Sequence, residues 1–133
     1  MKKPIPAFLS CLVAGVSLVA IDASAATIRV QCEQRGVQRS SISVDGNGLS
    51  ALPSGQMYRA QVVSSGNVAT SNGTPLDGDE VEFDFDSNPA DVAAGDTGIG
   101  TRFIVGGTVT GKILMPNGTT LIADTVACRV RNR

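Results

Sequence analysis

The stretch Ile28-Arg29-Val30-Gln31-Cys32 alternates apolar and polar residues, and Val126-Ala127-Cys128-Arg129-Val130 alternates near the other end of the chain. Successive side chains of a strand point to opposite faces, so both cysteines lie on the apolar side of their strands. In an exported protein this predicts a Cys32–Cys128 disulfide that links the first and last strands. The bond closes a loop of 95 intervening residues, for which chain-entropy estimates give roughly 4–5 kcal/mol. A redox-active pair is disfavoured because the CxxC spacing is absent.

Composition bounds the function of the 133-residue chain, which is 42% hydrophobic and contains no histidine. The length suits one domain. Histidine is the commonest general base near neutral pH and the commonest metal ligand, so its absence excludes Ser-His-Asp, Cys-His and histidine-containing zinc sites. The 11 basic residues are balanced by 12 acidic ones, which argues against a nucleic-acid partner.

Residues 1–25 have the pattern of a secretory signal peptide. Two lysines precede an apolar run from Ala7 to Ile21, and Ala23-Ser24-Ala25 is typical of a cleavage site. The run is shorter than the about 20 residues of a membrane-spanning helix. We therefore expect a periplasmic or secreted protein with no transmembrane anchor in the mature chain, residues 26–133. Lipid attachment at Cys11 is disfavoured because the apolar run continues past it.

Turn-forming pairs such as Asn-Gly and Asp-Gly recur along the mature chain, with short β-type runs between them. This spacing is typical of all-β sandwiches and barrels. We predict that residues 26–133 form one all-β domain, an immunoglobulin-like antiparallel β-sandwich with one short helix. The expected strands are residues 27–33, 40–45, 57–63, 80–86, 108–115 and 120–131.

Three connecting segments have patterns of their own. Asn88 as N-cap, Pro89 at the first helical position and Gly95 as the stop predict the short helix. The pattern of the last strand slips near Ala123-Asp124, which predicts a bulge or bend there. Residues 64–74 are small and polar and are expected to form a mobile loop. Residues 99–105 fit either a crossover that plugs the core or an exposed patch.

Acidic residues are concentrated in one segment. Eight acids and no basic residue lie between Asp77 and Asp96, whereas the rest of the mature chain has three acids and nine basic residues. In Glu80-Val81-Glu82-Phe83-Asp84-Phe85-Asp86 the alternation puts the apolar side chains inward. The expected acidic face therefore consists of Glu80, Glu82, Asp84 and Asp86. Neighbours on this face lie roughly 7 Å apart along the strand and repel one another.

Three compensating partners fit this face. Water and cross-strand arginines can balance it, each exposed pair contributing less than about 1 kcal/mol; the candidates are Arg29, Arg39, Arg59 and Arg102. A calcium ion takes six to eight oxygen ligands, and its candidate ligands are Asp84, Asp86, Asn88 and Asp91. The segment lacks two features of a calcium loop. Pro89 stands where the loop usually has a glycine, and the closing glutamate is absent. A basic protein or a second copy of this chain can also dock on the face.

The predicted function is therefore binding rather than catalysis. A glycosidase needs two carboxylates about 5–10 Å apart across a cleft, and a solvent-facing strand supplies no cleft, so no catalytic residue is predicted. The hairpin and bridging cysteines resemble exported bacterial sandwich domains, fimbrial subunits among them, but the mature chain reaches Thr27 at once and offers no donor strand. We expect a binding, envelope-associated or accessory module with an acidic docking face and no resident cofactor. The alternatives are a calcium-stabilised module and a small hydrolase.

Overall fold

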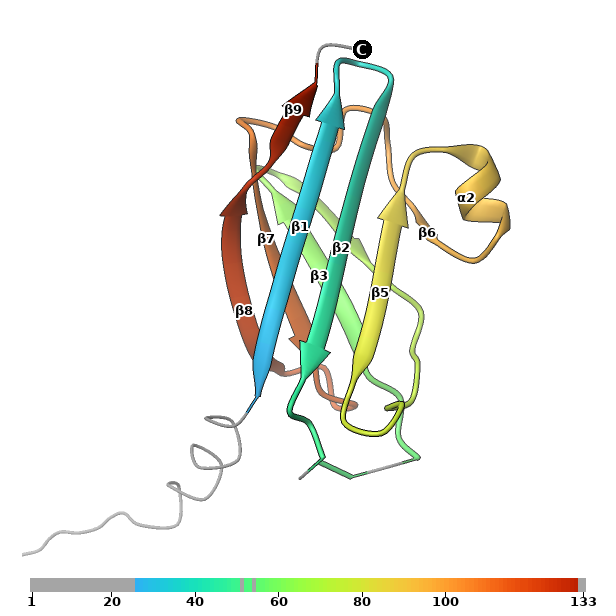
Figure 1. The fold of residues 1–133 in the computed structure, drawn as a ribbon, viewed down its shortest axis with the longest axis vertical. Coiled ribbons are helices and arrows are strands. Elements are labelled where there is room, and N and C mark those ends of the chain that lie inside the picture. The colour runs from blue at the N-terminus through green and yellow to red at the C-terminus, as the bar shows by residue number, and fades with distance from the viewer. Residues whose placement is uncertain (1–25, 51, 54, 132–133) are drawn as a thin grey trace, which may run out of the picture.

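The protein is a sandwich of two β-sheets (Figure 1). The structure, a computed structural model, describes residues 26–50, 52–53 and 55–131. The five-stranded sheet has the order β6-β5-β2-β1-β9 and the four-stranded sheet the order β4-β3-β7-β8. The prediction of an all-β sandwich with one short helix is confirmed. The predicted signal peptide, residues 1–25, lies outside the described residues.

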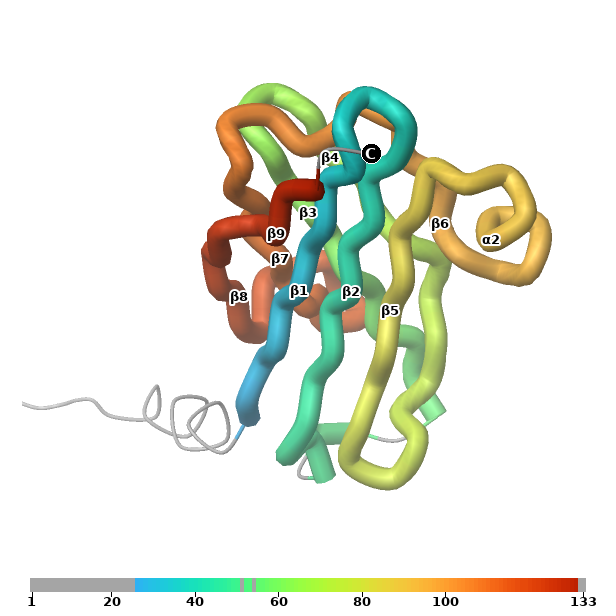
Figure 2. Tube along the Cα trace, turned by 45° about the horizontal axis from the view of Figure 1, so that its top comes forward, coloured from blue at the N-terminus to red at the C-terminus, as the bar shows by residue number. Residues whose placement is uncertain are grey.

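The five-stranded sheet forms one layer and the four-stranded sheet the other, as the tube in Figure 2 shows. The first layer contains β1 (Thr27–Arg35), β2 (Arg39–Asn47), β5 (Val81–Asp86), β6 (Thr97–Gly98) and β9 (Arg129–Arg131). The second contains β3 (Arg59–Ser64), β4 (Asn67–Thr70), β7 (Thr108–Leu114) and β8 (Thr120–Ala127).

The five-stranded sheet is mixed, which corrects the expected purely antiparallel sandwich. Strands β1, β2 and β5 pair antiparallel, but β9 pairs parallel with β1 and β6 pairs parallel with β5. The reason is that β9 continues β8 from the other sheet and arrives beside β1 running in the same direction.

The core lies between the sheets and follows the alternation of the strands. On β5, Val81, Phe83 and Phe85 are buried, as predicted, and they pack with inward residues of the other strands. These include Val30, Ile42, Val44, Ala60, Val62, Val109 and Ile113. Burying such side chains stabilises the fold by about 1.5–3 kcal/mol each. Tyr58 is also fully buried, and its hydroxyl donates to the carbonyl of Pro53 at 2.7 Å.

The predicted Cys32–Cys128 disulfide is confirmed. Cys32 lies on β1, and Cys128 lies where the chain leaves β8 and enters β9. The expected bend of the last strand is therefore at Cys128 rather than near Ala123-Asp124, while the register irregularity of this hairpin falls between Ile113 and Leu114 of β7. The Cys128 N–H donates to the carbonyl of Gly107 at 2.8 Å, so the bond and the 105–108 loop hold the point where the chain changes sheets.

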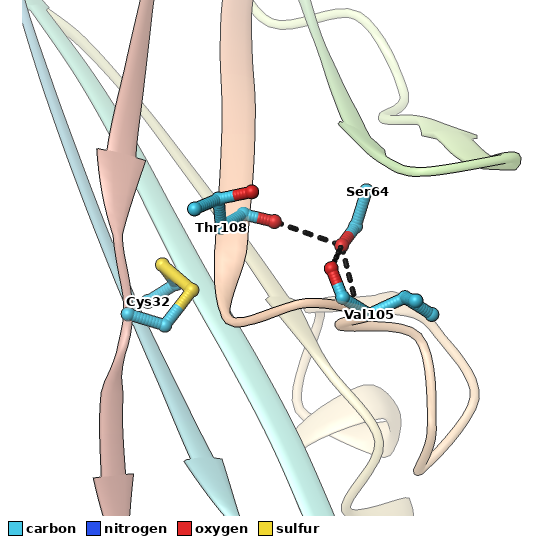
Figure 3. The surroundings of a disulfide bond; sticks show 5 residues. Cys32, Ser64, Val105 and Thr108 are labelled. Atoms are coloured by element: carbon cyan, nitrogen blue, oxygen red, sulfur yellow. Dashed lines mark hydrogen bonds between the residues drawn. A yellow bond between two sulfur atoms is a disulfide. The ribbon is translucent and has the colours of Figure 1, made fainter.

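Residues 99–105 cross from one sheet to the other and plug the core, because Phe103 and Ile104 are buried. A buried hydroxyl holds the end of this crossover (Figure 3). The Ser64 hydroxyl accepts a hydrogen bond from the Val105 N–H at 2.7 Å and donates one to the Thr108 carbonyl at 2.8 Å. The expectation that residues 64–74 form a mobile loop is corrected in part, because residues 67–70 form β4, which pairs with β3.

The short helix α2 (Pro89–Ala93) has the predicted ends. The Asn88 side chain accepts from the Ala90 N–H at 2.9 Å, Pro89 begins the helix, and Gly95 follows it with a φ of +125°. The helix lies beyond the edge of the five-stranded sheet (Figure 1). Within the described residues, no helix has the length and apolar character needed to span a membrane.

Candidate functional site

Three rows of polar residues cross the outer face of the five-stranded sheet. The pairing of β1, β2 and β5 sets each row: Glu33–Ser41–Asp86, Gln31–Ser43–Asp84 and Arg29–Asp45–Glu82. Two of the rows have a serine on the central strand and a carboxylate on β5. Short side chains between longer ones hollow the sheet along its centre.

An open groove of about 350 Å³ follows this hollow. Ser41 and Ser43 of β2 lie between its two sides. One side carries acids of β5 and of the segment after α2, and the other carries polar residues of β1 and β9. We call it the acidic groove; its polar lining residues are Gln31, Glu33, Ser41, Ser43, Asp84, Asp86, Asp96 and Arg129.

The four residues of the predicted acidic face differ in exposure. Glu80, Glu82 and Asp84 are exposed, whereas Asp86 is only 5% exposed. Arg39, at the start of β2, covers Asp86: its Nε donates to Oδ1 at 2.9 Å and its Nη2 to Oδ2 at 2.6 Å. The alternation correctly assigns Asp86 to the outer side of the strand, but the carboxylate is an ion-pair partner rather than a free surface charge.

The environment of Asp86 keeps it ionised. Burial alone raises the pKa of this carboxyl, but hydrogen bonds from Arg39 and from the Asn88 N–H outweigh burial and hold its pKa below the ordinary value. The hydrogen bond to Asp86 likewise raises the pKa of Arg39. Both partners therefore stay charged near neutral pH, and the pair is a fixed part of the groove.

The four candidate calcium ligands have separate partners. Asp84 Oδ1 accepts from the Ser43 hydroxyl at 2.7 Å, and Asn88 Oδ1 caps α2. Asp86 and Asp91 both accept from Nη2 of Arg39, at 2.6 and 2.8 Å. The structure therefore brings Asp86 and Asp91 together around a guanidinium and leaves Asp84 and Asn88 with other roles.

Asp96 joins Asp86 and Asp91, and one carboxylate oxygen from each of the three lies within 4.8 Å of the others. We call these three residues the aspartate cluster. The chain reverses after α2 at Gly95, and the Asp96 N–H donates to the Asp91 carbonyl at 3.1 Å. The glycine that follows a short capped helix is the signal that could have placed Asp96 beside Asp91. Burial and repulsion from Asp84, Asp86 and Asp91 raise the pKa of Asp96.

Negative charge also accumulates on the same face at the start of β5, away from the aspartate cluster. Asp45 of β2 lies opposite Glu82 of β5. Burial, together with repulsion from Glu82 and Asp84, raises the pKa of Asp45 despite Arg29 on the neighbouring strand. For both Asp45 and Asp96, burial is the largest cause of the raised pKa, and repulsion from neighbouring carboxylates adds to it.

Of the four arginines proposed to compensate the face, Arg39 does so directly. A second set of ion pairs lies at the other side of the groove, where Glu33 pairs with Arg35 and Arg131. Sequence reasoning missed the Glu33–Arg131 pair because it depends on the parallel pairing of β9 with β1, whereas Glu33 and Arg35 lie two residues apart on β1.

Comparison of the chain with protein-family models, curated proteins and solved structures finds no match.

Proposed function

We propose that the protein is an exported, non-catalytic binding module whose acidic groove docks a cationic partner. The observation that carries this proposal is that Asp84 and Asp96 line one open groove and that none of the ion pairs found in the described residues includes either of them. A partner that brings lysine or arginine side chains lowers the repulsion among these groups. Complementary charge also speeds association and selects among partners.

Export is supported by the signal-peptide pattern of residues 1–25 and by the Cys32–Cys128 bond. Disulfides form and persist mainly in oxidising compartments. The two observations together support a periplasmic or secreted location.

We also infer immunoglobulin-like character for the sandwich. In immunoglobulin domains, strands A, B and E share one sheet and strands G, F and C share the other. The runs β1-β2-β5 and β8-β7-β3 fit these two orders, and β4 takes the place of a strand added beside C in variable domains. The disulfide differs from that of antibody domains. It joins β1 to the β8–β9 junction, whereas the antibody disulfide joins strand B of one sheet to strand F of the other.

A small hydrolase has one observation in its favour. Asp86 and Asp96 lie in one cluster, and their pKa values are shifted in opposite directions, as in acid–base pairs of carboxylates. However, the oxygens of Asp86 already accept hydrogen bonds from Arg39 and the Asn88 N–H. Because Asp86 is committed to these donors, the arrangement favours binding over proton transfer.

The affinity of the purified mature chain for a labelled octalysine peptide tests the proposal. The Asp84→Asn variant is expected to bind about tenfold more weakly, a change of about 1.4 kcal/mol. The matched control is Asp124→Asn, which removes the same charge from β8 of the other sheet. Equal affinities of the two variants, or the absence of binding at low salt, would overturn the proposal.

A further inference from the structure

The edge of the five-stranded sheet beside β5 is paired only at its two ends. At one end β6 pairs with Phe85 and Asp86, and at the other end Asp77 bridges to Glu80. In the part of the chain that the structure describes, no strand pairs with residues 81–84 on the side away from β2. The first sheet therefore has an open position there.

The hydrogen bonds at the end of β5 show which backbone groups face this position. The Ser87 N–H donates to Ser40 of β2, whereas the carbonyl of Asp86 accepts from the Ile99 N–H beyond the edge. Backbone groups of successive residues in an antiparallel ladder point alternately to the two sides. The N–H and C=O groups of Glu82 and Asp84 therefore point away from β2. Because the parallel pairing of Phe85 with Thr97 uses the carbonyl of Asp84, the groups left facing the open position are the N–H and C=O of Glu82 and the N–H of Asp84.

A groove runs along this edge. A hollow of about 290 Å³ is lined by residues 71–74, 82–84 and 95–97, and a second of about 260 Å³ continues past Thr74 along residues 80–82. We call the two hollows the edge groove. In Figure 1 the chain segment after β4 runs beside β5 on this side of the sandwich. Four or five extended residues, about 13–17 Å of chain, match the unpaired length of β5.

The side chains along the edge groove define the ligand. Glu82 and Asp84 point outward from β5 and are exposed, and Glu80 and Asp77 lie at one end. Phe83 also lines the groove. An incoming strand that alternates basic and apolar residues would place its basic side chains beside the carboxylates of β5, an opposite-charge pairing that stabilises neighbouring strands.

We propose that an extended basic segment of a partner protein adds to β5 as a further strand in the edge groove. This inference rests on the proposed function: Asp84 and Asp96 line both the acidic groove and the edge groove, so a segment bound along the edge reaches the same carboxylates. Main-chain hydrogen bonds to Glu82 and Asp84 supply affinity, and the alternating side chains supply specificity. A second copy of this chain paired through β5 would place acids opposite acids, which is destabilising. In constant-type immunoglobulin sandwiches, a fourth strand completes the sheet at the corresponding position.

Backbone-modified peptides test this mode of binding on the unaltered protein. The probe is a synthetic hexapeptide of alternating lysine and valine, compared with two versions N-methylated at all lysines or at all valines. Methylation keeps the charge and removes the N–H groups on one edge of the peptide. We expect at least one methylated peptide to bind at least tenfold more weakly than the parent. Equal affinity of all three peptides overturns strand addition while leaving the acidic docking proposal intact, whereas no binding of any peptide overturns both.

A matched pair of variants tests the same point from the protein side. Glu82→Gln and Glu82→Pro remove the same charge, but proline also removes the N–H that faces the edge groove. Proline is tolerated on edge strands where the N–H faces outward, so the ladder to β2 stays complete. We expect the proline variant to bind the hexapeptide at least tenfold more weakly than the glutamine variant. Equal affinities contradict the inference, and if the proline variant does not fold, the methylated peptides decide.

Discussion

Arg39 donates to both carboxylate oxygens of Asp86, at 2.9 and 2.6 Å, and its Nη2 also donates to Asp91 at 2.8 Å. Arg39 begins β2, Asp86 ends β5 and Asp91 lies on α2. One guanidinium thus ties the helix to two strands of the five-stranded sheet. It also neutralises the most buried carboxylate of the acidic groove.

Replacing Arg39 by methionine is expected to lower the free energy of unfolding by about 3 kcal/mol, because removing one partner leaves a buried charge uncompensated. With Arg39 in place, the Asp86 side chain is only 7% exposed. Urea unfolding at pH 7 measures the change. The control is Arg102→Met, since Arg102 is exposed. A loss for Arg39→Met no larger than that of the control would contradict this role.

The disulfide is expected to contribute more to stability than the Arg39–Asp86 pair. Cys32→Ser is expected to lower the free energy of unfolding by roughly 4–5 kcal/mol, the chain-entropy estimate for loops of about 100 residues. Cys128→Ser and the double variant should lose about the same amount, because each removes the same bond. Thermal melting with and without a reducing agent checks the result. An unchanged melting temperature of the native chain after reduction would show that the bond does not stabilise the fold.

The pairing of the two cysteines was predicted from the export signal together with their positions on the apolar sides of their strands. Local alternation was enough to predict β1, β2 and β5 and the inward residues of β1 and β5. Each of these depends on the two-residue period of a strand, which the sequence shows directly. The same period placed Asp86 on the outer face, but the burial of Asp86 depends on α2 and Arg39. Those partners come from distant parts of the chain.

Other features depended on partners that a local pattern does not reveal. The run from Thr120 to Arg131 reads as one strand, yet it divides at Cys128 because its two parts pair with different sheets. Residues 67–70 are small or polar apart from Val68, and they form β4 by a hairpin to β3. Ser65 makes this turn with a φ of +54°, which few residues other than glycine adopt.

Calcium is expected to leave the melting temperature of the native chain unchanged, because Arg39 already donates to Asp86 and Asp91 of the aspartate cluster. Thermal melting in millimolar calcium and in chelator makes the comparison. A calcium-stabilised module would gain about 2.7 kcal/mol at a concentration 100 times its Kd. Such a gain, lost in Asp96→Asn, would favour the metal-binding alternative.

Gly46 allows the two sheets to approach closely. A Cβ atom at this position would lie 2.4 Å from Cδ1 of Ile113, across the core. Gly46→Ala is therefore expected to lower the free energy of unfolding by about 1–3 kcal/mol, the usual cost of overpacking. The control is Gly66→Ala in the β3–β4 turn, where an added Cβ meets nothing within 4 Å. Urea unfolding measures both variants. Equal stabilities would mean that Ile113 and its neighbours shift to accommodate the added methyl group without cost.

The aspartate cluster should make stability depend on pH in two opposite ways. The folded-state pKa of Asp86 is lowered, so the stability that Asp86 contributes is present above its unfolded pKa and is lost as the pH falls through its folded pKa. The folded-state pKa of Asp96 is raised, so ionised Asp96 opposes folding, and this opposition disappears as the pH falls through its folded pKa.

Asp96→Asn isolates the second effect. We expect this variant to melt a few degrees higher than the native chain at pH 7, because it removes repulsion with Asp84, Asp86 and Asp91. The difference should shrink as the pH falls through the raised pKa of Asp96 towards the ordinary aspartate value of about 4. Melting curves between pH 3 and pH 8 measure it, with Asp124→Asn as the control for removing one exposed charge. A lower melting temperature for Asp96→Asn at pH 7 would mean that the ionised carboxylate stabilises the cluster, through a bound cation or through Arg39.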